Sequence, residues 1–296
     1  MGLARGTLLA QCSTCMQLHN AFAQTLVDDL QPIYLRADPN GLAFDHHGGA
    51  LYIADAYSGA ILCIEGTQQH RIATIECGGV IGERIGGLAI TPYGTLFVTR
   101  IGHGTAGAVF KVEPDGQIEE VARLPVEYQR LGVTYDAREH ALYTTQFRSS
   151  GRGAHDGSIV SIDLVTGEPS TVLDGFAKPI GIVKLGPTLV VADARQRAVF
   201  RIEMASGRAV MRLQVAGNIG RPDSLCLYGL DSVLVTTYDD DAQRGSLRRI
   251  WLDGRQCVIA SGPWMPRGVA TDGERGFVAM RRGGQVMVFM VEPSDL

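Results

Sequence analysis

The chain has 296 residues, of which 45% are hydrophobic and 20% are charged, and its formal net charge is −4. This apolar content can offset the entropy of ordering a core, which excludes an intrinsically disordered chain. Because 31 acidic residues outnumber 27 basic ones, we expect neither a nucleic-acid partner nor a membrane-surface partner for the molecule as a whole.

The first 24 residues are predicted to form a short helical extension. Apolar side chains recur at helical spacing from Leu8 to Phe22, as on an amphipathic helix packed on a larger body. The only apolar piece near the start, Leu8–Ala10, is too short for a secretory signal, and six cysteines do not make a disulfide framework at this length. We therefore expect a cytoplasmic protein with reduced thiols.

A sequence unit of about 45 residues occurs six times along the rest of the chain. Each copy has an apolar-x-apolar run, a polar turn, a short strand of alternating polarity, and a third alternating run. In most copies a fourth run follows. The copies open at Gly41, Gly87, Gly132, Gly181, Ser224 and Gly268.

This repeat predicts an all-β protein, a six-bladed β-propeller with four-stranded antiparallel blades that forms one domain over residues 1–296. The alternation of period two excludes a helical solenoid, whose apolar residues would recur every 3.6 positions. The last copy ends after its third strand, near Val286–Val291. Because an open sheet edge invites aggregation, we expect the segment Thr25–Arg36 to supply the missing strand of blade six.

The loops that enter the predicted inner strands share a basic residue one to five positions before each copy opens. Two interpretations stay open: these residues form a basic channel mouth for an anionic ligand, or they brace their loops. The residues are Arg36, Arg84, Arg130, Lys178, Arg221 and Arg267.

The loops after the second strands fall on the same predicted face, and three of them are long and rich in glycine or serine. Lengthened loops on one face of a repeat array mark its binding side. One of their histidines, His103, can titrate near neutrality, although a hydrogen bond within the loop is the favoured interpretation for this histidine alone. The candidate ligand-binding residues here are Tyr57, Arg100, His103, Gln146, Arg148 and Tyr238.

Two stretches resemble known propellers. The first, Asp38-Pro-Asn-Gly-Leu-Ala-Phe-Asp together with Leu51-Tyr-Ile-Ala-Asp-Ala-Tyr57, resembles first-blade sequence of strictosidine synthase-like and gluconolactonase-like (senescence marker protein) propellers. The second, Arg221-Pro-Asp223-Ser-Leu-Cys-Leu, resembles the fifth-blade motif of the gluconolactonase group. In that group the aspartate is a metal ligand and the general base, and the resemblance in architecture spans essentially the whole chain.

The resemblance also implies a divalent cation on the channel axis: calcium, magnesium or zinc. The group holds it with a glutamate from blade one, asparagines from blades three and four, and the fifth-blade aspartate. The matching positions here are Asn40, Leu131, Ile180 and Asp223. Asn40 and Asp223, with Asp193 as a further oxygen ligand, are thus the candidate metal ligands, and their shell is incomplete for a hard cation.

The leading hypothesis is a hydrolase of a small anionic lactone or related cyclic ester. Asp223 would activate water as a general base, and Arg221 and Arg130 would stabilise the developing oxyanion. The substrate-binding set comprises Asn40, Tyr57, Arg84, Arg100, His103, Gln146, Arg148, Lys178, Tyr238 and Arg267.

Two alternatives remain open at this stage. One is a metal-independent lyase or isomerase, in which arginines bind the anion and Asp55 or Asp193 moves protons. The other is a non-catalytic propeller of the NHL-repeat kind that binds a ligand or a protein. This second alternative predicts an exposed aromatic patch around Tyr57, Phe147 and Tyr238.

Overall fold

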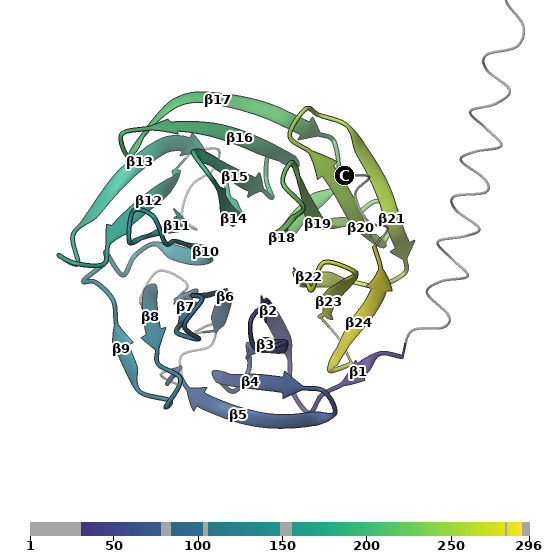
Figure 1. The fold of residues 1–296 in the computed structure, drawn as a ribbon. Helices are drawn as coiled ribbons and strands as arrows, with labels where there is room; N and C mark the ends of the chain where they lie inside the picture. Colours follow the sequence, from purple (N-terminus) through teal and green to yellow (C-terminus); the bar gives the residue numbers. More distant parts are fainter. Residues whose placement is uncertain (1–30, 78–83, 103–105, 149–155, 282, 292–296) are drawn as a thin grey trace, which may run out of the picture.

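A computed structural model describes residues 31–77, 84–102, 106–148, 156–281 and 283–291. They form six four-stranded antiparallel sheets, arranged around a central axis as the blades of a propeller (Figure 1). The predicted fold class is confirmed, and the helix expected over residues 1–24 lies outside the described residues. Nowhere in the described ranges is there a helix of the length and apolarity that crossing a bilayer requires.

The first three blades follow one another along the chain, each running from the axis outward. Blade one holds β2 (Pro39–Asp45), β3 (Ala50–Asp55), β4 (Ala60–Glu65) and β5 (Gln68–Thr74). Blade two holds β6 (Ile85–Ile90), β7 (Leu96–Arg100), β8 (Ala108–Val112) and β9 (Ile118–Glu120). Blade three holds β10 (Gln129–Asp136), β11 (Ala141–Phe147), β12 (Gly157–Asp163) and β13 (Pro169–Phe176).

The last three blades repeat this order, and the sixth borrows its outer strand from the start of the described chain. Blade four holds β14 (Pro179–Leu185), β15 (Thr188–Asp193), β16 (Ala198–Ala205) and β17 (Arg208–Gly217). Blade five holds β18 (Arg221–Tyr228), β19 (Ser232–Asp239), β20 (Arg244–Trp251) and β21 (Gln256–Gly262). Blade six holds β22 (Pro266–Thr271), β23 (Arg275–Met280), β24 (Gln285–Met290) and β1 (Ile33–Tyr34).

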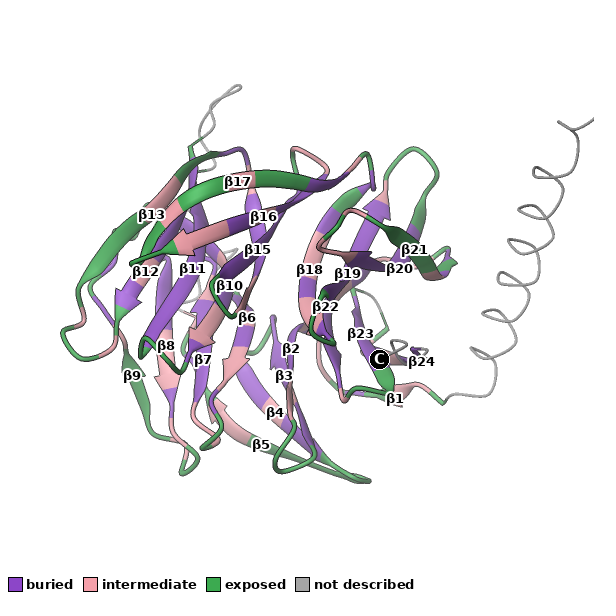
Figure 2. Cartoon of the chain, turned by 45° about the horizontal axis from the view of Figure 1, so that its top comes forward, coloured by how far each residue is buried: buried purple, intermediate pink, exposed green. Residues whose placement is uncertain are grey.

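Apolar side chains from neighbouring blades form the core. Each of the six apolar clusters found among the described residues joins adjacent blades, as Ile61 of blade one and Val98 of blade two do. Burial is highest in the second strands and falls toward the rim (Figure 2): all seven residues of β11 are buried, and all three of β9 are exposed. Removing apolar surface from water between the blades therefore holds the ring together.

The glycines that open the repeat copies allow the inner strands to approach one another closely at the axis. A Cβ atom on Gly41 would overlap the carbonyl oxygen of Gly86, and one on Gly87 would overlap that of Leu131. No side chain fits between the inner strands at these points. The close packing of the hub therefore explains why glycine recurs at this position of the repeat.

The ring is closed by the strand that the sequence predicted. Within the segment Thr25–Arg36, β1 pairs with β24 through Ile33 opposite Val286 and Tyr34 opposite Gln285. The amide of Leu35 extends this ladder by donating to the carbonyl of Gly284 at 2.6 Å. The strand β1 is thus the outer strand of blade six, and Leu35 packs in the apolar cluster between blades six and one.

Shortening the Leu35 side chain in this closing segment should destabilise the ring. Leu35 is 9% exposed and Leu230 is 84% exposed, so Leu230→Ala is the matched control. We expect Leu35→Ala to lower the free energy of unfolding by about 2–4 kcal/mol, because it removes buried methyl groups and leaves a cavity. The measurement is the midpoint of the first urea-unfolding transition. Equal midpoints for the two variants would show that closure by β1 does not stabilise the ring.

Candidate functional site

A β-bulge interrupts each inner strand near its start. In β18, for example, Pro222 pairs with Thr237 and Ser224 with Thr236, so Asp223 is left as the extra residue. The residue that precedes the opening Gly or Ser falls in this bulge in all six blades. We call these six equivalent positions the hub ring: Asn40, Gly86, Leu131, Ile180, Asp223 and Arg267.

Threonine hydroxyls in second strands fix several of these bulges. The Thr145 hydroxyl accepts from the amide of Gly132 at 2.9 Å and donates to the carbonyl of Ile180 at 3.2 Å. Thr236 bridges Ser224 to the carbonyl of Arg267 in the same way. Each such threonine joins the bulge of its own blade to the hub-ring residue of the next blade, which fixes the backbone at the axis.

The hub ring lies between two cavities. The larger, of about 850 Å³, opens among the loops that lead into the inner strands and out of the second strands. The smaller, of about 230 Å³, extends along the inner strands toward His46 and Tyr135. Four hub-ring residues line both, and they are the four positions that the resemblance singled out: Asn40, Leu131, Ile180 and Asp223.

Asp223 is the only acidic residue among the described residues that line the larger cavity. Burial raises the pKa of its carboxyl, and the charges of Arg267, Lys178, Arg281 and Arg221 act in the opposite direction. Within the described part of the chain these cations act on Asp223 through their charge, and none forms a hydrogen bond with it. The carboxyl is therefore a proton acceptor whose basicity the surrounding fold sets.

Basic side chains surround Asp223. The cavity is lined by Arg84, Lys178, Arg195, Arg221, Arg267 and Arg281. Three of these cations have carboxylate partners: Arg267 and Arg84 contact Asp38 at 3.2 and 3.8 Å, and Arg221 contacts Asp240 at 2.8 Å.

The other three cations, Lys178, Arg195 and Arg281, form no ion pair with any described carboxylate. Lys178 lies over the Phe147 ring, with its Nζ 5.4 Å from the ring centroid. Burial lowers the pKa of Lys178, and the nearby charges of Arg221 and Arg195 lower it further, whereas Asp223 raises it. The cavity thus holds an excess of positive charge although the chain as a whole is acidic.

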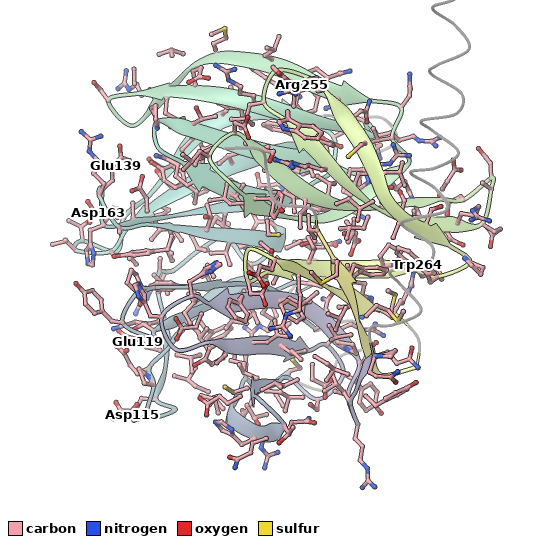
Figure 3. All side chains as sticks on the ribbon, turned by 45° about the vertical axis from the view of Figure 1, so that its right-hand side comes forward. Asp115, Glu119, Glu139, Asp163, Arg255 and Trp264 are labelled. Carbon is pink, nitrogen blue, oxygen red and sulfur yellow. The ribbon has the colours of Figure 1, made fainter. Side chains whose placement is uncertain are left out.

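Exposed acidic side chains also occur away from the hub. They lie along the outer edge of the molecule (Figure 3): Asp115, Glu119, Glu139 and Asp163. The excess of positive charge in the hub cavity draws small anions toward the axis.

The structure brings seven of the predicted site residues together around the larger cavity: Asn40, Arg84, Lys178, Arg221, Asp223, Tyr238 and Arg267. The sequence reasoning did not select Arg195 and Arg281, although both follow second strands, nor Asp38, the partner of two hub cations. Their positions in the sequence could have indicated them. Asp38 lies two residues before Asn40, and both arginines lie in loops that follow second strands, on the predicted binding face.

Arg130 braces loops instead of lining the cavity. It is completely buried, and its Nη1 donates to the carbonyls of Gly107, Pro125 and Tyr128 at 3.0, 3.0 and 3.2 Å. Its Nη2 donates to Oε1 of Gln146 at 3.0 Å. Burial lowers the pKa of Arg130 to about 10. Of the two interpretations of the basic loop residues, Arg130 and its partner Gln146 therefore fit the one in which the side chain braces loops.

The remaining arginines of the predicted set also have contacts outside the cavity. Arg100 donates to a backbone carbonyl of its own loop at 2.7 Å, and Arg148 pairs with Glu127 at 3.0 Å. Tyr57 is 84% exposed and does not line the cavity. His103 lies outside the described residues.

Asp55 and Asp193 end the second strands of blades one and four and hold loops in place. The Asp193 carboxylate is fully buried and accepts hydrogen bonds from four backbone amides, those of Ala177, Lys178, Arg195 and Gln196. The Asp55 carboxylate accepts from the amides of Asp38 and Tyr57 and from the Ser58 hydroxyl. Neither lines the larger cavity, so the structure does not bring Asp193 to the axis as a metal ligand.

The hub ring does not fit a hard divalent cation. Only Asn40 and Asp223 carry side-chain oxygen donors there, and the Asn40 amide nitrogen donates to the carbonyl of Ile85 at 2.9 Å. Leu131 and Ile180 offer no side-chain ligand, whereas calcium takes six to eight oxygen ligands in proteins. The cations around Asp223 would also repel a metal ion.

A different group of possible ligand atoms lies in blade one, away from the axis. Atoms of Cys63, Glu65 and His70 lie within 4.8 Å of one another, on β4 and β5, the two outer strands of that blade (Figure 1). Burial raises the pKa of the Cys63 thiol to about 11. This group is separate from the cavity and takes no part in its chemistry.

These features define a six-bladed propeller with a polar, basic hub cavity. No known family profile matches the sequence, and no curated protein matches it either. Solved structures do share the fold. A gluconolactonase from Xanthomonas campestris is 15% identical, with 92% of this chain and 93% of that chain covered, at a TM-score of 0.70.

Two further structures span a range of activities on this fold. A calcium-binding protein, regucalcin, from Agrobacterium tumefaciens is 14% identical, with 90% and 94% of the two chains covered, at a TM-score of 0.65. A streptogramin B lyase is 14% identical, with 88% and 97% covered, at a TM-score of 0.60. At these identities the likeness shows the fold, so the expected resemblance to gluconolactonase-like propellers is confirmed at that level; the strictosidine synthase-like detail stays a prediction.

The raised pKa of Asp223 makes stability depend on pH in a defined direction. The folded protein holds this proton more tightly than the unfolded chain does. Ionisation of the carboxyl therefore lowers the free energy of unfolding as pH rises from about 3.9 through the folded pKa. Asp223→Asn should therefore unfold at higher urea than the wild type at neutral pH, and the difference should vanish near pH 4.

The matched control is Asp253→Asn. Hydrogen bonds from Arg255 lower the pKa of the Asp253 carboxyl, so its removal should cost stability at neutral pH, with the opposite sign. Urea unfolding from pH 4 to pH 8 measures both differences. A difference between Asp223→Asn and the wild type that does not change with pH would contradict a raised pKa.

Proposed function

We propose that this propeller hydrolyses a small anionic lactone or related cyclic ester in its hub cavity, with Asp223 as the general base. The observation that carries the proposal is one partly buried carboxyl of raised pKa in a cavity that six cations also line. A carboxyl whose pKa is raised toward the working pH is a stronger base than an ordinary aspartate. The cations supply both the attraction for an anion and the stabilisation of new negative charge.

The proposed step is balanced within the cavity. The Asp223 carboxylate takes a proton from water, and the water oxygen forms a bond to the carbonyl carbon of the ring ester. The carbonyl electron pair moves onto its oxygen, where Arg267 and Lys178 stabilise the charge. When the bond from the acyl carbon to the ring oxygen breaks, Asp223 returns the proton to that oxygen. The product is a hydroxy acid, and Asp223 is again ionised.

The proposal assigns no step to a metal ion. The side chains of the hub ring offer two oxygen donors at most, and the positive charge that a metal would contribute to the carbonyl oxygen is already available from arginine and lysine. A calcium, magnesium or zinc ion on the axis thus has neither the ligands nor the electrostatic role that it has in a metal-dependent hydrolase.

A lyase is the second candidate, and a streptogramin B lyase of the same fold favours this reaction class. As in the hydrolase, we assign no step of it to a metal ion. Asp55 and Asp193 are engaged by loop amides, so the proton acceptor in this case would also be Asp223, taking a proton from carbon. Isotope-labelled water separates the two reactions: hydrolysis places one atom of ¹⁸O in the product, and elimination places none.

A purely binding propeller has less support. It predicted an exposed aromatic patch around Tyr57, Phe147 and Tyr238, but Phe147 is 4% exposed and Tyr238 is 8% exposed. Both aromatic rings pack within the blades, and Tyr57 alone is exposed. The described surface therefore lacks the patch that would favour a protein partner at this position.

Removing the proposed base should abolish the chemistry and leave the fold intact. We expect Asp223→Asn to lower kcat on a panel of γ- and δ-lactones by about 10²–10⁴-fold, the usual contribution of a positioned base. Proton release into an indicator dye measures hydrolysis, and Asp253→Asn serves as the control that keeps its rate. Full activity of Asp223→Asn on any lactone that the wild type hydrolyses would remove this mechanism.

Removing any bound metal tests separately whether hydrolysis depends on a metal ion in the hub ring. Dialysis against EDTA followed by metal-free buffer should leave the hydrolysis rate within about twofold of the untreated protein, because no step uses a metal. Elemental analysis of the same samples reports what was removed. If activity falls with the metal content and returns on adding calcium or zinc, the site contains a metal that the hub ring was judged unable to hold.

A further inference from the structure

Four of the six cations that line the larger cavity lie in two pairs, on the two blades that neighbour Asp223. Lys178 and Arg195 belong to blade four, and Arg267 and Arg281 belong to blade six. Asp223 belongs to blade five, which lies between them (Figure 1). We refer to the two pairs as the blade-four cations and the blade-six cations; they flank the carboxyl from opposite sides.

Backbone contacts hold each pair in position. The amides of Lys178 and Arg195 both donate to the Asp193 carboxylate, at 3.1 and 3.0 Å, so the two loops of blade four are joined where these side chains begin. In blade six the amide of Arg281 donates to the carbonyl of Met265 at 2.9 Å, which joins the loop after β23 to the loop that leads to Arg267. The cations are therefore presented by two fixed loop pairs.

The charges in the cavity are unbalanced even when Asp223 is ionised. Arg84, Arg221 and Arg267 each have a carboxylate partner, whereas Lys178, Arg195 and Arg281 have none among the described residues. Against these three, Asp223 supplies one negative charge. Holding a partly buried ammonium without a counter-ion is costly, and the cost is relieved when a ligand brings negative charge to that point.

We propose that the ligand carries two separate anionic groups, one held by the blade-four cations and one by the blade-six cations, with its middle over Asp223. This inference rests on the proposed function only in placing an ester in that middle. Two carboxylates, or a carboxylate and a phosphate, share the required chemistry, since arginine and lysine bind either group. The cavity of about 850 Å³ has room for such a molecule, because ligand pockets of this size enclose far larger compounds than a simple lactone.

Calorimetric titration at low salt tests this arrangement with three simple probes. Glutarate carries two separated carboxylates, butyrate carries one, and glycerol phosphate carries both charges on one group. We expect glutarate to bind about tenfold more tightly than butyrate or glycerol phosphate, and its affinity to fall as salt is added. Equal affinity for glutarate and butyrate, or for glutarate and glycerol phosphate, would overturn the proposal of two separate subsites.

Three variants locate the subsites. Lys178→Met and Arg281→Met should each weaken glutarate binding by about tenfold, and each should leave the residual affinity close to that for butyrate. The control is Arg255→Met, which removes an arginine that is paired with Asp253 at the edge of the molecule (Figure 3) and should change nothing. Arg281 is exposed, so its variant will fold even if the Lys178 variant does not. Unchanged glutarate affinity in Arg281→Met contradicts the proposal.

The same titration separates this inference from the proposed function. Asp223→Asn should retain or tighten glutarate binding, because it removes a negative charge beside the ligand while abolishing hydrolysis. Tight glutarate binding with no hydrolysis of any lactone would overturn the hydrolase and leave the two subsites standing. Asp223-dependent hydrolysis of uncharged lactones, with no preference for glutarate, would do the reverse.

Discussion

The site depends on a constraint that the ring imposes on its own backbone. Six inner strands meet at the axis so closely that glycine is needed at the contact, as at Gly41 and Gly87. Each strand enters this contact through a β-bulge, and the bulge presents one residue per blade at the level between the two cavities. A bulge redirects a side chain without breaking the sheet around it. Because the blade core fixes the bulge and threonine hydroxyls such as that of Thr236 satisfy its backbone, the residue at this position is free to vary, and it varies from Gly86 to Asp223.

That variability gives the hub its chemistry. Leucine and isoleucine in blades three and four make one side of the ring apolar, which increases the effect of burial on the carboxyl at position 223. Arg267, the neighbouring ring residue, is oriented by Asp38 at 3.2 Å. Lys178 and Arg281 then act on the same carboxyl from blades four and six. In this arrangement the positive charge at the hub is supplied by side chains of the protein itself.

The sequence allowed the fold to be predicted well, and the site only in part, for a physical reason. Alternation and the periodic glycine are properties of the backbone packing, so the six blades and the closing strand could be predicted from them. The role of a loop residue depends on which acceptors the fold places around it. Arg130 and Lys178 occupy corresponding entrances, yet the first meets three carbonyls and Gln146 and the second meets a ring face and open cavity. Composition cannot distinguish these two environments, nor could it show that Asp193 would be saturated by amides.

The central claim is that the fold itself makes Asp223 an unusually basic carboxyl within a cationic cavity. The most direct measurement is the pKa of that carboxyl, followed by the ¹³C chemical shift of protein labelled at aspartate side-chain carboxyls and assigned with Asp223→Asn. The account predicts a titration above the ordinary aspartate value of about 3.9, displaced to higher pH because burial outweighs the surrounding cations. A carboxyl that titrates at or below the ordinary value would show that the cations dominate, and Asp223 would then be a fixed counter-ion and not a base.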